Sequence, residues 1–388
     1  MKKYTDIFAE DIELPGIVNQ KMEDAFSKIK TEKIASKDNF SDFKAKRNKS
    51  IKLFKNQVAA IASICILILG SITTYAICNY LWSRGMKGTL QATDVQQQTL
   101  VEEGVATILQ EQEDYAHMAV TDGGVTVIPE MMVVNEKMVY ISLSVEGYNL
   151  LESQEPCFEF VDVYQGDDPN AEEGWLMMGA SFYDGIVPTE DGINVYEDGS
   201  PLKFDENGRL ISYYADEEGN LEYIVVAMVS NPEDSLLGKT LHINLSNLGT
   251  VYKTDYAEDI DGKWNFTFDL PNVSSTKEIS IKNRVDDTAF VVDSIEISPV
   301  SIKINYSIDD TKTSGGGGKV PLFNGVILED GTQYTNMVDM GKRGYTDACL
   351  SEAYTISSFT RVIDPEQVTA IILETNRGMK VVAVKKSK

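Results

Sequence analysis

Histidine and cysteine are scarce in this chain of 388 residues, which has two histidines and four cysteines. No pair of cysteines has the C-x-x-C spacing, and no cysteine clusters with a histidine, so the usual structural zinc motifs are excluded. We therefore expect no metal site. No pattern typical of a bound cofactor is present either, and we expect none.

Catalytic signatures are also missing. His242 lies in an alternating stretch, on the side opposite to its leucines, which predicts a surface histidine. His117 has no local motif of a Ser-His-Asp arrangement around it. The run Gly315–Gly318 is followed by Lys319 but lacks the spacing and the Ser or Thr of a phosphate loop, so we interpret it as a linker. We expect no enzymatic activity and no catalytic residue.

Acidic turns are frequent, and one of them, at Asp205, Asn207 and Gly208, has the first elements of a calcium loop. No glutamate follows at the position that a calcium loop requires. Hairpin turns use the same residue types because Gly, Asn and Asp accept a positive φ. We interpret these segments as turns.

Basic residues are outnumbered, with 35 Lys and Arg against 60 Asp and Glu and a net charge of −25. The imbalance is uneven along the chain. Residues 1–57 contain 13 basic and 9 acidic residues, whereas the rest contains 22 and 51. An acidic surface repels phosphate, so we expect no direct binding to nucleic acid.

One long stretch carries no charge at all, between Lys55 and Arg84. A helix needs about 20 largely apolar residues to cross a bilayer, and residues 58–82 supply them. Tyr75, Tyr80 and Trp82 fit an interfacial aromatic belt. We predict a single transmembrane helix over residues 58–82, with the lipid bilayer as its surroundings.

The charges that flank this stretch predict its orientation. Basic residues are retained on the cytoplasmic side, so we expect the N-terminus inside the cell and the C-terminus outside. A cleaved signal peptide is the weaker alternative, because such signals span only about 15–30 residues in total. The residues that determine the topology are Lys44, Lys46, Arg47, Lys49, Lys52 and Lys55.

The cytoplasmic segment 1–57 is too short and polar for a core of its own. Within it, the stretch LPGIVNQKMEDAFSKIKTEKI has apolar residues on one helical face and predicts a short amphipathic helix. That face can dock into a groove of a partner protein, lie on the inner leaflet, or form only transiently. The candidate partner-binding residues are Val18, Met22, Phe26 and Ile29.

The remainder of the chain is expected to be mainly β. Residues 83–118 are polar with a weak helical pattern and predict a juxtamembrane stalk or an entering helix. Farther on, apolar and polar residues alternate in 139–145, 241–245 and 264–270, which is typical of half-buried strands.

Turn sequences between these runs favour packed antiparallel sheets, and we predict two β-sandwich-like extracellular units, 119–283 and 284–388. A disulfide between Cys157 and Cys349 is open if this part lies outside the cell, because sequence separation does not report proximity.

Four segments together resemble a known family: the leader LPGIVNQKMEDAFSKIK before the basic patch and span, VTDGGVTVIPEMMVVNEKMVYISLSVEGY, GKWNFTFDLP and IDPEQVTAIIL. Over most of its length the chain is similar to the Firmicute domain-of-unknown-function family 4179, single-pass membrane proteins described as anti-sigma-factor-like. The resemblance implies a cytoplasmic segment that holds a sigma factor and an ectodomain that senses envelope conditions. Residues 1–57 contain neither His nor Cys, so the zinc-containing anti-sigma domain is excluded.

The leading hypothesis is therefore a membrane-anchored envelope regulator with an unidentified extracellular ligand. In this class, release of the partner can follow proteolysis near the membrane, here between Trp82 and Met118. The rival hypothesis is a surface-anchored binding or adhesion module with no transcriptional role.

Overall fold

The computed structural model describes residues 82–384 except 113–114, 116, 152–153, 167–175, 190–191, 253–254 and 310–318. The predicted amphipathic helix with Val18–Ile29, the basic patch Lys44–Lys55 and the predicted membrane segment as far as Leu81 lie outside these residues and stay predictions. None of the helices within the described residues is long and apolar enough to cross a membrane.

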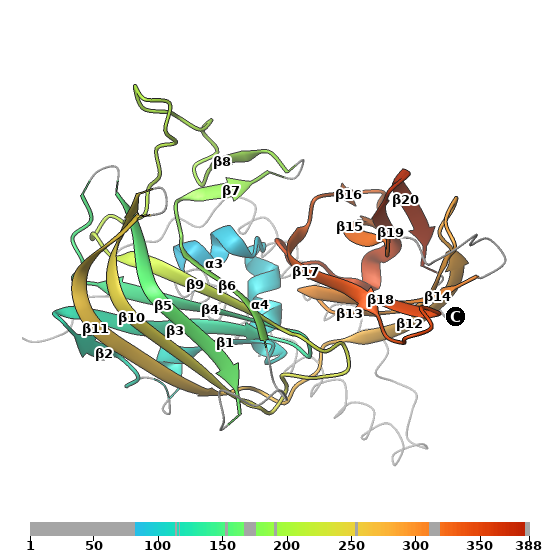
Figure 1. Ribbon diagram of the computed structural model, residues 1–388, viewed down its shortest axis with the longest axis horizontal. Coiled ribbons are helices and arrows are strands. Elements are labelled where there is room, and N and C mark those ends of the chain that lie inside the picture. The colour runs from blue at the N-terminus through green and yellow to red at the C-terminus, as the bar shows by residue number, and fades with distance from the viewer. Residues whose placement is uncertain are drawn as a thin grey trace, which may run out of the picture. The chain divides into compact units, whose positions relative to one another are not determined.

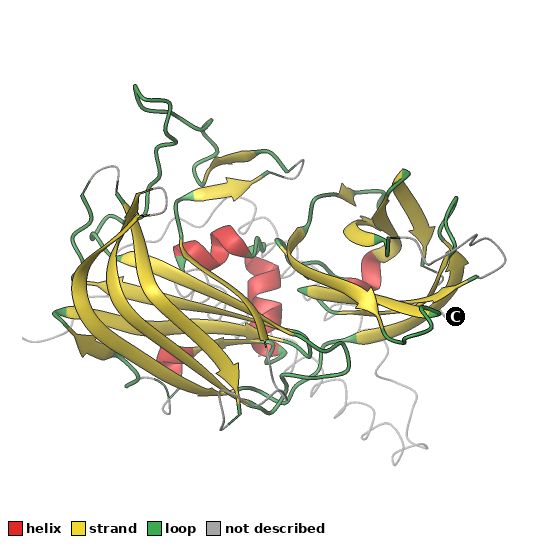
Figure 2. Ribbon diagram, in the orientation of Figure 1, coloured by secondary structure: helices red, strands yellow, loops and turns green. Residues whose placement is uncertain are grey.

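The described chain is mainly β, as the alternating patterns predict (Figure 2). Four larger sheets enclose two hydrophobic cores, one pair of sheets to each core. All the strand pairs in these sheets are antiparallel. A small ribbon of β7 (Ile186–Pro188) and β8 (Asn194–Tyr196) stands apart from them (Figure 1).

The first sandwich pairs a six-stranded sheet with a three-stranded one. The six-stranded sheet has the order β1-β3-β4-β9-β6, with β2 added beside β3, and the other has the order β11-β10-β5. The strands are β1 (Ala106–Ile108), β2 (Val120–Asp122), β3 (Val125–Val134), β4 (Met138–Glu146), β5 (Glu155–Gln165), β6 (Leu176–Phe182), β9 (Leu221–Val229), β10 (Thr240–Tyr252) and β11 (Asp255–Asp269).

Burial along β4 differs from the half-buried strand that its sequence predicts. Val139 and Ile141 belong to the first core, as expected, but Tyr140 and Ser142 on the opposite face are also fully buried. The helix α3 (Arg84–Thr89) packs against β4 and β9 and helps to cover that face. The second face of the sheet is therefore an interior surface.

The expected stalk is instead part of the first sandwich. Residues 83–118 form α3, α4 (Asp94–Glu102), β1 and the short 3-10 helix η1 (Leu109–Glu111). Met86, Leu90 and Leu100 are fully buried. Trp82, expected in the membrane interface, is only 2% exposed within the same core. The few apolar residues of this segment are widely spaced, which made it look like a polar spacer.

The second sandwich pairs a five-stranded sheet, order β12-β13-β14-β18-β17, with a four-stranded one, order β16-β15-β19-β20. It begins at Lys277, a few residues before the predicted boundary at 284. Its elements are β12 (Lys277–Arg284), β13 (Phe290–Ile297), β14 (Ser301–Ile308), β15 (Leu322–Leu328), β16 (Gln333–Tyr334), β17 (Val338–Tyr345), β18 (Glu352–Phe359), η3 (Pro365–Gln367), β19 (Val368–Thr375) and β20 (Gly378–Ala383).

Polar and apolar contacts join the two sandwiches, which lie in one compact unit. The buried Nδ2 of Asn135 donates hydrogen bonds to Ser298 Oγ at 2.7 Å and Ser301 Oγ at 2.6 Å. The hydroxyl of Tyr140 donates to the backbone oxygen of Phe359 at 2.9 Å. Side chains of the second sandwich also extend the first core, namely Val300, Tyr354, Ile356 and Val362.

Candidate functional site

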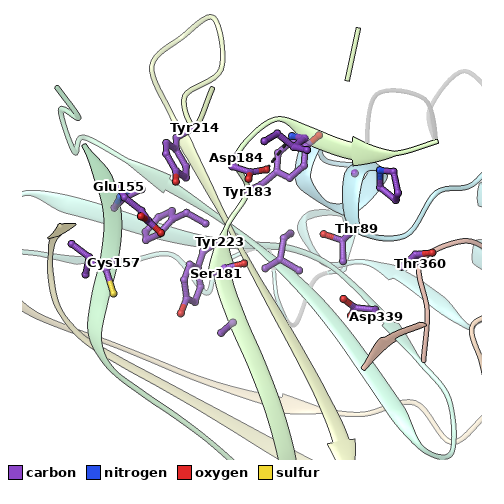
Figure 3. A pocket seen from close by; sticks show the side chains of 18 residues that line it. Thr89, Glu155, Cys157, Ser181, Tyr183, Asp184, Tyr214, Tyr223, Asp339 and Thr360 are labelled. Atoms are coloured by element: carbon purple, nitrogen blue, oxygen red, sulfur yellow. Dashed lines mark hydrogen bonds between the residues drawn. The ribbon is translucent and has the colours of Figure 1, made fainter. Parts of the chain in front are cut away.

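A cleft of about 480 Å³ opens beside β6, and residues of both sandwiches line it. In the view of Figure 3, Glu155 and Cys157 lie at one end of the lining and Asp339 and Thr360 at the other, with Ser181 of β6 between them. A space of this size suits a small molecule or a few side chains of a larger ligand. No sequence motif marks this place, because its walls come from strands far apart in the chain.

Aromatic rings of the first core reach the wall of the cleft. The ring centroid of Tyr223 lies 4.8 Å from that of Phe182 and 4.9 Å from that of Phe158. Tyr223 is only 3% exposed, and its hydroxyl has no hydrogen-bond partner among the described residues. The hydroxyl oxygen is not one of the fully buried unpartnered atoms of the described residues, so it can be reached from the cleft.

Helix α3 forms part of one wall of the cleft. Gly88 and Thr89 line the cleft. A Cβ on Gly88 would stand 2.2 Å from Cε2 of Tyr183, closer than any packed side chain tolerates. The absence of a side chain at Gly88 therefore lets α3 approach the ring of Tyr183, which is itself part of the lining.

This contact makes a testable prediction. Gly88→Ala is expected to lower the free energy of unfolding by about 1–3 kcal/mol, because the buried ring of Tyr183 must move. The change should be seen in urea denaturation, although alanine favours a helix over glycine. The matched control is Gly179→Ala, whose Cβ would meet only the flexible end of Met340 at 3.2 Å. Equal stability of the two variants would refute the close packing.

Arg84, the first residue of α3, binds residues 197–214, the segment that follows β8. Its Nε donates to the two carboxylate oxygens of Glu197 at 2.8 and 2.9 Å. Its terminal nitrogens donate to the backbone oxygens of Tyr213 at 2.6 Å and Tyr214 at 3.1 Å. The guanidinium also lies 5.0 Å from the centre of the Tyr183 ring. The sequence showed Arg84 only as a charge following the apolar stretch, and this anchoring role was missed.

Three carboxylates line the cleft, from three different parts of the fold: Glu155 of β5, Asp184 after β6 and Asp339 of β17. Burial raises the pKa of Asp184, whose Oδ1 accepts a hydrogen bond from the backbone N of Ile186 at 3.0 Å. Surrounding protein raises the pKa of Asp339 to about 6, although its side chain stays exposed. No lysine or arginine is among the described residues that line the cleft. The lining is therefore electronegative at neutral pH.

The cysteines do not form the disulfide that the sequence left open. Cys157 is half-buried in the cleft and Cys349 is exposed, and both are free thiols. Burial raises the pKa of Cys157, which disfavours the reactive thiolate. The described residues contain no group of three His, Cys, Asp or Glu side chains that could hold a metal ion.

Two other expectations concern residues outside the cleft. His242 lies half-exposed, with its ring stacked on Tyr164 at 4.7 Å between centroids, consistent with the surface histidine that the sequence predicts. The Oδ1 of Asp205 accepts backbone hydrogen bonds from Asn207 and Arg209, each at 2.8 Å. That carboxylate thus closes a turn, which is the role that its sequence suggests.

Comparison with known proteins adds little to this geometry. No family model and no curated protein matches the chain. A solved structure described as the crystal structure of the conserved domain protein from Bacillus anthracis is similar over 74% of this chain and 81% of its own. The identity is 12% and the TM-score is 0.40, so this likeness carries no argument about function.

Proposed function

We propose that this protein is a membrane-anchored envelope sensor and regulator that resembles anti-sigma factors. Its two-sandwich part would lie outside the cell, and its cytoplasmic segment would hold a sigma factor. The observation that supports this proposal best is the position of α3. This helix lines the cleft and begins at Arg84, with only Trp82 and Ser83 between it and residues 58–81 of the predicted membrane segment.

The start of α3 is firmly held in the fold. Both oxygens of the buried Glu222 carboxylate accept hydrogen bonds from the helix, from Gly85 N at 2.6 Å and Met86 N at 3.2 Å. Ser83 caps the same turn through its hydroxyl, which accepts from Met86 N at 3.2 Å. The start of α3 is therefore fixed to strand β9, which carries Glu222.

A ligand can use this arrangement to send a signal. Tyr183 lines the cleft and packs on Gly88, and Arg84 lies over its ring. An occupant that displaces Tyr183 would therefore shift α3. Through α3 it would also shift the segment that precedes this helix in the chain. Such a shift requires that the ligand bind one position of α3 more tightly than the other.

Inside the cell, the apolar face of the predicted helix would hold the partner. The face formed by Val18, Met22, Phe26 and Ile29 suits a hydrophobic groove on a sigma factor, the common mode for amphipathic helices. In this proposal the protein acts on transcription only through its partner and does not touch nucleic acid itself.

Co-purification with the full chain tests the cytoplasmic half of the proposal. Wild-type protein, isolated from its native cells, should retain a sigma factor, and Val18→Asp/Phe26→Asp should reduce the recovery at least about tenfold because two charges enter the apolar face. Gln20→Asp/Ser27→Asp is the matched control, since it adds the same charge to the opposite helical face. If no sigma factor is recovered, or both double variants behave alike, the protein does not hold one, and the adhesion-module hypothesis replaces this proposal.

A further inference from the structure

We infer that the cleft beside β6 binds a ligand that carries more than one ammonium group, such as a polyamine or a lysine-rich peptide. The inference deepens the proposed function by naming the ligand class, and its physiological role rests on that proposal. The binding itself depends only on the described part of the chain.

The arrangement of charge in the cleft comes first. Glu155 and Asp339 lie at opposite ends of the lining, with Asp184 on a third element. The carboxylates of Glu155 and Asp339 have no hydrogen-bond or ion-pair partner among the described residues. Arg84, a cation near this wall, already has Glu197 and two backbone oxygens as partners. The cleft therefore repels anions and offers a separate carboxylate to a cation at each end.

The remaining polar groups of the cleft suit the same ligand. The hydroxyl of Tyr223 has no hydrogen-bond partner among the described residues and can accept a hydrogen bond. An ammonium group has three donors and no acceptor, so carboxylate and hydroxyl oxygens together can satisfy it. The half-buried ring of Tyr214 adds an aromatic face, which attracts cations and packs on methylene chains.

Other ligand classes fit the cleft less well. A phosphate or carboxylate ligand would meet three acids and no lining lysine or arginine. A metal ion would need several oxygen, nitrogen or sulfur ligands close together, and no such group of His, Cys, Asp and Glu exists among the described residues. An extended organic cation uses the acids at both ends as well as the apolar wall between them.

Calorimetric titration of the full chain in nonionic detergent at low salt tests this inference. The probes are spermine and pentalysine, with butylammonium as a single-charge control and pentaglutamate as an anionic control. We expect spermine or pentalysine to bind at least about tenfold more tightly than butylammonium, and pentaglutamate not to bind. Binding of spermine alone would identify free polyamines as the source of the ammonium groups, and binding of pentalysine alone would identify peptides.

Two double variants locate the binding. Glu155→Gln/Asp339→Asn should weaken the affinity for the better probe at least about tenfold. Glu278→Gln/Asp286→Asn removes the same net charge from exposed positions outside the cleft and should change it less than about twofold. If both double variants weaken the affinity equally, the effect comes from the net charge of the protein alone, and the inference is overturned.

The two cysteines of the described residues, both free thiols, provide a second readout in the same protein. Saturating probe should slow N-ethylmaleimide labelling of Cys157 in the cleft at least about fivefold and leave the exposed Cys349 unchanged, as resolved by peptide mass spectrometry. Failure of both polycations to bind, or an unprotected Cys157, would overturn the inference even if a sigma factor co-purifies. Protection of Cys157 without a sigma factor would instead leave the ligand class standing and remove the proposed transcriptional role.

Discussion

Trp82→Ala is expected to lower the free energy of unfolding by about 3–5 kcal/mol, the usual cost of removing a large aromatic side chain from a packed core. Trp82 is 2% exposed and belongs to the core of the first sandwich, although it ends the charge-free stretch of the sequence. Urea denaturation of the full chain in detergent, followed by circular dichroism in the far ultraviolet, measures the loss of the β-structure.

Two further variants make this measurement specific. Trp82→Phe keeps most of the apolar contact and removes an indole N–H that has no hydrogen-bond partner among the described residues, so its cost should be smaller, about 1–2 kcal/mol. Val95→Ala, at a helix position that is 66% exposed, should change the stability by less than about 0.5 kcal/mol. If Trp82→Ala were as mild as Val95→Ala, Trp82 would belong to the membrane segment, as the sequence predicts.

The position of Trp82 also bears on how a signal could leave the domain. The sequence predicts an accessible stalk between Trp82 and Met118, where proteolysis could release the partner. In the structure, β1 of the same stretch pairs with β3, and α3 and α4 bury apolar side chains. A protease would have to unfold part of the sandwich to reach the chain here, because cleavage needs a locally extended segment. Loosening of α3 would then have to precede any cut.

Individual strands could be predicted from the sequence because a period of two reports which side chains share a face. The alternating runs at 139–145, 241–245 and 264–270 lie in β4, β10 and β11. The same period does not report what covers the other face. Tyr140 and Ser142 look like outward positions of a half-buried strand, yet both are fully buried. The helices and the neighbouring sandwich that enclose them come from distant parts of the chain.

The second sandwich begins before the boundary that the sequence predicts, for a local reason. In β12 the pairing with β13 shifts register between Ser280 and Asn283, and Lys282 has a positive φ of 55°. This irregularity breaks the alternation that marks a strand in the sequence. The cleft was beyond prediction for a different reason, because nothing local to Glu155 or Asp339 indicates that they line one space.

Asn135→Ala is expected to lower the free energy of unfolding by about 2–4 kcal/mol, because it leaves buried backbone donors without partners. The Oδ1 of Asn135 accepts from Lys137 N at 2.8 Å and Met138 N at 2.9 Å, which closes the turn between β3 and β4. Its Nδ2 contacts Ser298 and Ser301 of the second sandwich. Differential scanning calorimetry should show the loss, and the exposed Asn194→Ala serves as its control.

Asn135 makes two kinds of contact, one that closes its own turn and one that joins the sandwiches, and a variant can separate them. Ser301→Ala removes one of the two Asn135 contacts between the sandwiches and keeps the turn at Asn135, so its cost should be well below that of Asn135→Ala. Because Glu155 belongs to the first sandwich and Asp339 to the second, both variants should also weaken polycation binding. Loss of stability with unchanged affinity would show that the cleft keeps its form without this joint, and that Tyr140 and the shared apolar side chains suffice to hold the sandwiches together.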